Sequence, residues 1–481
     1  MLSPLIRRPG RNAEPRSRER GVTMALVALS MAVIICMAAL SIDIGTLYQA
    51  KAEAQRAADA AALTAARFIS ISGVTGTTQP SWAQICGGAV NPATLAATSM
   101  AQAQQNWIGG VAATTVNVLY GEGTSAPTST DCSTVTNFDV NPTVTVSVKR
   151  TNLPVFFARI FSLFGGNYAG STVSATATAE AYNPSGAIPL APVNPRCVKP
   201  WFVPNLDPEH TGFSFVAPTT GQIQKPGIST TGVIGETFTL IADCGPSGRR
   251  RGRCVLQDTP SPVANGYGGA NSLDYLPGQV LNPAIAIAAN STISACSDVN
   301  NNDFTKAVAG CDQSTVYACG DSLTTNAVDL TEDPGPPRND SVNGVQCLIN
   351  ESANGLNNGQ DYLAPAGPAP YTYPFQIQAG ANSALVSAGI ASPSQVTSSP
   401  SIVSLPIYDS NAVTTFTPPT TQVTVVGFLQ VFINSATGNA TTGTINVTVM
   451  NVAGCGNSYG GPPPPVALGT SPVPVRLITP P

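Results

Sequence analysis

Histidine is the side chain best suited to acid–base chemistry near neutral pH, and the chain of 481 residues has only one, His210, in the sequence DPEHTG. A Ser-His-Asp site would have to use it, but the G-x-S-x-G turn that often carries the serine is absent from the sequence. Neither a P-loop nor a dinucleotide-binding fingerprint is present. We therefore predict that His210 is a solvated loop residue, and that the protein is not an enzyme and holds no cofactor. An enzymatic alternative would depend on His210.

Cysteine is the other residue type that could supply a reactive site or metal ligands, and the chain has eleven. A zinc site would need C-x-x-C pairs or several histidines, which the sequence lacks. One cysteine, Cys36, lies in an apolar run, and the even number that remains is typical of disulfides in an exported protein. Short separations make Cys244–Cys254 and Cys311–Cys319 candidate pairs, although the sequence does not fix the connectivity. We predict no metal site, and disulfides among Cys86, Cys132, Cys197, Cys244, Cys254, Cys296, Cys311, Cys319, Cys347 and Cys455.

Charge is sparse and unevenly distributed. The net charge is −4, yet six arginines gather near the N-terminus: Arg7, Arg8, Arg11, Arg16, Arg18 and Arg20. The remainder is therefore acidic, which argues against a nucleic-acid partner because phosphate binding needs a basic face. We interpret the short basic run Arg249–Arg253 as a solvated loop, with a polyanion or headgroup contact as the alternative.

The apolar run over residues 22–42, VTMALVALSMAVIICMAALSI, predicts a transmembrane helix. At ~1.5 Å per residue it reaches roughly 31 Å, which is enough to cross the hydrocarbon core of a bilayer. The arginines before it predict a cytoplasmic N-terminus, so the chain from Asp43 onward would lie outside the cytoplasm. A cleaved signal peptide is the alternative, but its apolar core is usually only ~7–15 residues long and is followed by a helix breaker. We predict an uncleaved single-pass anchor.

The helix is expected to continue beyond the membrane, because residues 43–70 contain no proline and only one glycine, Gly45. Small and apolar residues recur there in steps of three and four: Leu47, Ala50, Ala54, Ala57, Ala61, Thr64 and Phe68. This spacing places them on one helix face. Small residues let another backbone approach closely. The alternative is that the alanines merely make a good helical spacer.

Elements after this helix predict a small α+β domain. Residues 92–107 read as a second helix, and residues 153–165 as a short amphipathic helix or turn. Residues 114–120, 143–149 and 171–182 are strand candidates, and the last two have the alternating pattern of strands. We expect an α+β fold in which a transmembrane helix continues into a long Ala-rich helix packed on a small antiparallel sheet.

The rest of the chain divides at two proline-rich stretches, within residues 183–197 and 365–375. We expect a loop-rich, disulfide-bearing region between them and a β-rich part after them, with strands in 401–410, 421–435 and 444–455. The predicted organisation is a basic cytoplasmic tail (1–21), a transmembrane helix (22–42), an α+β domain (43–182), a Pro-rich linker (183–197), a Cys-bearing loop-rich region (198–367), a β-rich region (376–458) and a Pro-rich tail (459–481).

The N-terminal segment carries a specific resemblance. Arg20-Gly21 precedes the span, Asp43 and Gly45 follow it, and Leu47-Tyr48 leads to the box Gln55, Asp59, Ala60, Ala61, Ala62 and Leu63. In this order the motifs resemble TadG-like proteins of Tad/Flp pilus assembly, clearly over residues 18–69 and more loosely to about 182. Leu26 stands where type IV prepilins have a glutamate, which fits an anchored component better than a polymerised pilin. The D-x-S-x-S motif of von Willebrand A domains, which some relatives carry, is absent from the sequence.

The resemblance implies a membrane-anchored, non-enzymatic, adhesion-related component of a Tad/Flp-type pilus assembly or secretion apparatus. It would sit in the bacterial inner membrane, with its body periplasmic or extracellular. We expect contact with pseudopilin-like proteins, or self-association through the Ala-rich helix, to involve Asp43, Gly45, Ala54, Gln55, Ala57, Asp59 and Ala61. The alternative is a cell-surface adhesin or ligand-binding module anchored by the same helix.

Overall fold

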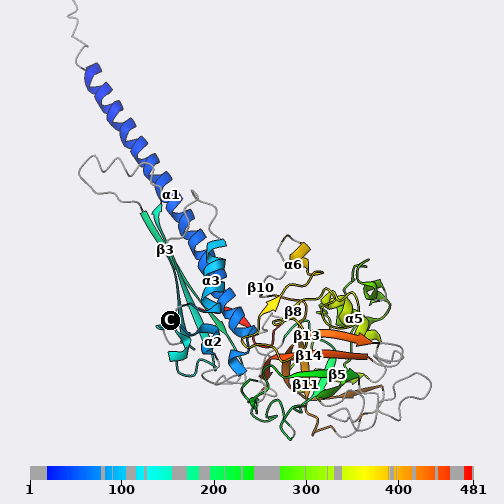
Figure 1. Cartoon of the computed structure of the whole chain (residues 1–481). Helices are drawn as coiled ribbons and strands as arrows, with labels where there is room; N and C mark the ends of the chain where they lie inside the picture. The colour runs from blue at the N-terminus through cyan, green and yellow to red at the C-terminus, as the bar shows by residue number, and fades with distance from the viewer. Residues whose placement is uncertain are drawn as a thin grey trace, which may run out of the picture.

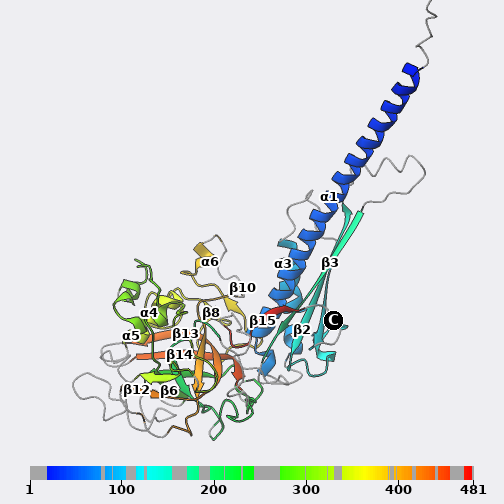
Figure 2. The same ribbon diagram turned by 180° about the vertical axis from the view of Figure 1, so that it is seen from behind.

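Helix α1, Glu19–Ile71, runs unbroken through the predicted membrane span and the alanine-rich segment that follows (Figure 1). The computed structural model describes residues 19–76, 82–88, 90–103, 115–123, 127–153, 171–183, 195–210, 212–228, 231–242, 271–297, 299–321, 323–329, 339–387, 389, 395–396, 398–413, 416, 419–438, 443–455 and 471–478. Residues 23–38 of α1 are all exposed, and α1 projects away from the rest of the molecule (Figures 1 and 2). Among the described residues, α1 is the one helix long and apolar enough to cross a membrane.

The second half of α1 packs on a four-stranded sheet, and together with helices α2 (Ala83–Cys86) and α3 (Pro92–Ala103) they form the N-terminal domain. The sheet has the order β1-β2-β3-β15 with every neighbouring pair antiparallel, and its strands are β1 (Thr115–Glu122), β2 (Pro142–Leu153), β3 (Ser171–Ala181) and β15 (Val475–Ile478). The expected long helix on a small antiparallel sheet is confirmed. Residues 104–107 and 154–165, for which helix or turn was predicted, lie outside the described residues.

Small side chains bring α1 close to the sheet. Val144, Val146 and Val148 of β2 are fully buried, and their register partners on β3 are alanines. The facing side of α1 is also alanine, with Ala54, Ala57, Ala58, Ala61, Ala62, Ala65 and Ala66 each 0 % exposed. The layers are the sheet, with valines on β2 and alanines on β3, and helix α1, with alanines. These small and branched side chains let the two backbones approach without voids.

A closed barrel of six strands forms the other half of the molecule. Its order is β11-β13-β14-β5-β6-β4, with strands β4 (Trp201–Pro204), β5 (Thr237–Ala242), β6 (Ser272–Pro277), β11 (Ile402–Tyr408), β13 (Val425–Gly438) and β14 (Gly443–Gly454). The long β13–β14 hairpin lies in the segment predicted to be β-rich. However, β4, β5 and β6 belong to residues 198–367, where irregular structure was expected, so these three segments differ from the prediction. One barrel is built from both parts of the sequence.

Shorter elements surround the barrel. Two small sheets have the orders β10-β9-β8 and β12-β7. The elements are β7 (Ala327–Asp329), β8 (Tyr362–Leu363), β9 (Ile377–Gln378), β10 (Gln395–Val396), β12 (Thr420–Gln422), α4 (Asp303–Ala309), α5 (Asn339–Ile349), α6 (Ala384–Ser387) and the 3-10 turns η1 (Val74–Gly76), η2 (Cys132–Thr134), η6 (Ser294–Ser297) and η7 (Val299–Asn301).

The two halves meet where α1 ends. The side-chain amide of Asn451 on β14 donates to the Ser70 carbonyl at 2.9 Å, and that of Asn183 donates to the Val452 carbonyl at 2.9 Å and to the Thr75 hydroxyl at 2.9 Å. These polar groups are buried beside an apolar cluster that contains residues of both halves. The seam therefore fixes the barrel to the end of α1.

The C-terminal strand also joins the halves. Strand β15 pairs antiparallel with β3, at Val475↔Ala181 through Ile478↔Thr178, and so completes the N-terminal sheet. These residues belong to the segment 459–481, which was expected to be a Pro-rich tail, so the structure differs from that expectation. Of the remaining predicted features, the basic tail to residue 18, most of the linker (184–194) and the run Arg249–Arg253 lie outside the described residues.

Four disulfides join described residues: Cys86–Cys132, Cys197–Cys311, Cys296–Cys347 and Cys319–Cys455. The candidate pair Cys311–Cys319 is wrong, because each of these cysteines is bonded to a partner more than a hundred residues away. Cys244 and Cys254 lie outside the described residues. Cys36, in the apolar half of α1, is a free, exposed cysteine.

Candidate interaction site on helix α1

Helix α1 changes character at Asp43, where the exposed apolar run ends and the helix enters the N-terminal domain. The side chain of Asp43 is only 2 % exposed, and the Thr46 hydroxyl donates to the Asp43 carbonyl at 2.8 Å within the helix. From Asp43 to Arg56 one face of α1 is covered and the opposite face is open, whereas no residue of α1 beyond Arg56 is exposed. The sites expected to contact a partner divide between these two faces.

The alanines fall on the covered face. Ala54, Ala57 and Ala61 are each 0 % exposed and belong to the apolar cluster that runs from the N-terminal domain into the barrel. The expected contact of these three side chains with another protein is therefore replaced by a contact within the chain. The periodicity correctly marked a packing face, but the chain's own sheet occupies it.

Gln55 and Asp59 lie at the edge of the covered face. The Gln55 amide donates to Asp59 Oδ1 at 2.8 Å and to the Thr176 carbonyl of β3 at 3.2 Å. One turn earlier, the Lys51 ammonium donates to the Ser174 carbonyl of the same strand. These bonds fix the position of α1 along β3, so Gln55 and Asp59 position the helix on the sheet.

A buried ion pair joins α1 to β2, one of the two inner strands of the sheet. Glu53 Oε2 lies 2.9 Å from Nη1 of Arg150 on β2, and the side chain of Arg150 is 0 % exposed. Two other guanidinium nitrogens, Nε and Nη2, have no hydrogen-bond partner among the described residues. A guanidinium remains charged at physiological pH, so Glu53 is needed to neutralise it there.

The open face of α1 forms an outer strip, which we define as Gly45, Tyr48, Gln49, Ala52 and Arg56. All five residues are exposed, and their spacing of three and four places them on one side of the helix. Tyr48 is 74 % exposed. A Cβ added to Gly45 would meet no atom within 4 Å, so the chain's own packing does not require a glycine there. Of the predicted contact residues, Gly45 alone belongs to this strip.

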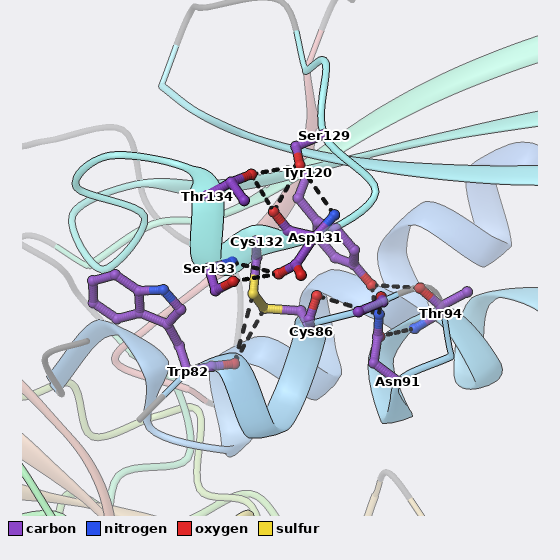
Figure 3. The surroundings of a disulfide bond; sticks show 11 residues. Trp82, Cys86, Asn91, Thr94, Tyr120, Ser129, Asp131, Cys132, Ser133 and Thr134 are labelled. Carbon is purple, nitrogen blue, oxygen red and sulfur yellow. Dashed lines mark hydrogen bonds between the residues drawn. A yellow bond between two sulfur atoms is a disulfide. The ribbon is translucent and has the colours of Figure 1, made fainter. Parts of the chain in front are cut away.

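The disulfide Cys86–Cys132 of the N-terminal domain is surrounded by polar side chains that bond to one another (Figure 3). Cys86–Cys132 links α2 to η2, and the Tyr120 hydroxyl donates to Asn91 Oδ1 at 2.9 Å. Burial raises the pKa of Tyr120 to about 12, despite the opposing hydrogen bonds of Thr94 and Asn91. The phenol is therefore neutral and fully engaged, which is the arrangement of a structural residue. This region supports α3, which packs on α1.

His210 does not behave as expected. Its side chain is 17 % exposed, and Nδ1 lies 3.0 Å from Asp207 Oδ2 and 2.8 Å from Glu236 Oε1. The prediction of a solvated loop histidine is wrong, because two buried carboxylates enclose the ring. Among the described residues, these three side chains are the group that could hold a metal ion.

Comparison with known proteins gives one result. Residues 21–67 match the model of the Flp pilus-assembly TadE/G-like family. No curated protein and no solved structure matches the chain. The matched segment is α1 itself, from the start of the exposed apolar run to the end of the alanine-rich packing face. The N-terminal segment of the chain, residues 21–67, is therefore similar to the Flp pilus-assembly TadE/G-like family.

Proposed function

We propose that the protein is a membrane-anchored, non-enzymatic component of a Tad/Flp-type pilus assembly or secretion apparatus. The observation that carries the proposal is the coincidence of the family match with one continuous helix. The first half of α1 is exposed and apolar, as a lipid-facing segment must be, and the second half is rigidly built into the folded body. Movement or force at the anchor would reach the body without a flexible joint.

The inner membrane is the proposed location, with the N-terminus cytoplasmic and the body periplasmic or extracellular. Arginines precede the apolar run, and the cytoplasmic side of a membrane segment usually carries such an excess of positive charge. The disulfides of the body support this orientation, because structural disulfides persist mainly outside the reducing cytoplasm.

The outer strip is the proposed contact with pseudopilin-like partners. Glycine destabilises a helix interior by about 1 kcal/mol relative to alanine, and nothing within the chain requires Gly45. A glycine at that position does permit a second helix to approach closely. Gly45 leaves a depression in the outer strip because it has no side chain. Tyr48, one turn away, projects a mostly exposed aromatic ring from the same strip.

The test is a substitution that fills the gap without touching the core. Gly45→Leu introduces a bulky side chain on the open face, and Ser99→Leu places the same side chain on the exposed surface of α3 as a matched control. We expect Gly45→Leu to abolish co-purification with pseudopilin-like proteins, while Ser99→Leu leaves it unchanged. Equal co-purification of both variants with these partners would contradict the proposal.

Adhesion is the proposed contribution of the barrel. The barrel lies at the end of the molecule remote from the exposed apolar run (Figures 1 and 2), which leaves it free to meet a surface. A free-standing adhesin and an apparatus component differ in one outcome. If Gly45→Leu removes pilus components and surface binding together, adhesion depends on the apparatus; surface binding that survives favours the free-standing adhesin.

A further inference from the structure

A cluster of titratable side chains lies at one end of the barrel. Asp207 follows β4 and Glu236 immediately precedes β5, and both strands flank β6. Because β4 is antiparallel to β6 and β5 is parallel to it, the end of β4 and the start of β5 meet at the same end of the barrel. Residues distant in sequence are thereby brought together.

The geometry of the cluster is compact. His210 Nδ1 lies 3.0 Å from Asp207 Oδ2 and 2.8 Å from Glu236 Oε1, and the three ligand atoms all lie within 4.8 Å of one another. The other Asp207 oxygen, Oδ1, accepts backbone hydrogen bonds from Glu209 at 3.0 Å and from His210 at 2.8 Å. These bonds fix the carboxylate so that Oδ2 faces the imidazole.

Glu236 is the more deeply buried acidic group of the cluster, and its side chain reaches His210 from the start of another strand. Its side chain is 0 % exposed, and its partners are the other two members of the cluster, with His210 Nδ1 2.8 Å from Oε1 and a side-chain hydrogen bond to Asp207. Its backbone is fixed, because the Val449 amide on β14 donates to the Glu236 carbonyl at 2.9 Å. Two buried carboxylates on either side of one imidazole nitrogen need a proton or a cation between them.

We propose that Asp207, His210 and Glu236 bind a first-row divalent transition-metal ion, for which Zn²⁺ is the probe. A mixed set of one imidazole and two carboxylates suits such ions, whereas Ca²⁺ and Mg²⁺ prefer oxygen ligands alone. Tetrahedral zinc with bonds of about 2.0–2.2 Å separates its ligand atoms by about 3.4 Å, a spacing that falls within the 4.8 Å spanned by the three ligand atoms of the cluster. The ion would offset the carboxylate charges and tie β4 to β5.

The direct test uses the full-length protein, purified in detergent micelles without a histidine tag and stripped with a chelator. Cys36→Ser serves as the background, so that zinc cannot bind this free thiol. We expect calorimetric titration to give one Zn²⁺ per chain. His210 is the only histidine, so X-ray absorption at the zinc edge must show nitrogen coordination from this ring, and its NMR signals must shift. Absence of stoichiometric zinc, or zinc bound without nitrogen coordination, would overturn the proposal.

Two ligand variants and one control give a second measurement. Glu236→Gln and His210→Ala should each weaken zinc binding at least about tenfold, the scale on which metal sites respond to altered ligand shells. Asp303→Asn changes an exposed carboxylate that pairs with Lys306 and should leave the affinity unchanged. Equal affinity in all three variants would contradict the assignment, and Ca²⁺ binding as tightly as Zn²⁺ would contradict the proposed class of ion.

Discussion

Glu53 on α1 and Arg150 on β2 form an ion pair of 2.9 Å in which the guanidinium is fully buried. The pair joins the TadE/G-like helix to the middle of the sheet, at a level just beyond the exposed apolar run. A helix that enters a folded body at this point must be held against the sheet. The pair and the hydrogen bonds of Lys51 and Gln55 to β3 hold it there.

Removing one partner of this pair should destabilise the N-terminal domain. Glu53→Gln leaves the buried Arg150 charge unpaired, and we expect the free energy of unfolding to fall by about 3 kcal/mol. The double variant Glu53→Gln/Arg150→Met should recover most of this loss. Urea denaturation of the full chain in micelles measures the free energy of unfolding. The control is Asp303→Asn, which removes a more exposed ion pair and should change this free energy by no more than about 1 kcal/mol. If Asp303→Asn destabilised the protein as much as Glu53→Gln, the claim that the buried Glu53–Arg150 pair holds α1 on the sheet would be wrong.

An alanine-to-leucine substitution should destabilise the protein on the covered face of α1 and leave its stability nearly unchanged on the open face. Ala57 is 0 % exposed against the sheet, so Ala57→Leu should overpack the core and lower the free energy of unfolding by about 1–3 kcal/mol. Ala52 lies on the exposed outer strip, and Ala52→Leu should change it by less than about 0.5 kcal/mol. Thermal and urea denaturation of both variants make the comparison. Equal destabilisation would show that the covered face is assigned wrongly.

Glu351 should make stability depend on pH. The side chain is 1 % exposed, and its two oxygens accept from the Gly355 amide at 2.7 Å and the Ala436 amide at 2.8 Å. Burial raises the pKa of Glu351 from 4.5 to about 8, against the lowering effect of these two bonds. Between these values the folded state binds more protons than the unfolded state, so its stabilisation is full below 4.5 and is lost as the pH rises through about 8.

The matching experiment compares wild type with Glu351→Gln at about pH 5 and about pH 9, in the presence of a chelator. The stability of the wild type relative to the variant should be greater at the acidic pH than at the alkaline pH. A difference that is the same at both pH values would show that the raised pKa of Glu351 is wrong.

The sequence was sufficient to predict local elements but not their partners. The apolar run and the three-four spacing predicted α1, alternation predicted β2 and β3, and residues 114–120 were a strand candidate that matches β1. The same spacing could not say that the chain's own sheet covers Ala54, Ala57 and Ala61, because packing partners are set by tertiary structure. The outer strip was missed for the same reason: an exposed face is defined only once the covered face is known.

The other differences between the predicted and the observed elements arise where strands far apart in the sequence pair with one another. Strands β4, β5 and β6 are short and their pairing partners are far along the chain, so no local pattern marked them. Strand β15 has only four residues and follows a proline-rich stretch, yet β3 supplies its edge. His210 was judged on its loop alone, whereas Glu236 reaches it only because β4 and β5 both pair with β6.

The central claim is that the open face of α1 meets the pilus-assembly apparatus just outside the membrane. The most direct measurement is site-specific photo-crosslinking in cells that express Tad/Flp pilus genes, with the photoreactive residue at Tyr48 and, as the control, at Ser99. We predict an adduct between position 48 and a pseudopilin-like component, identified by mass spectrometry, and no such adduct from position 99. The absence of an adduct at position 48, or the same adduct from both positions, would contradict the account.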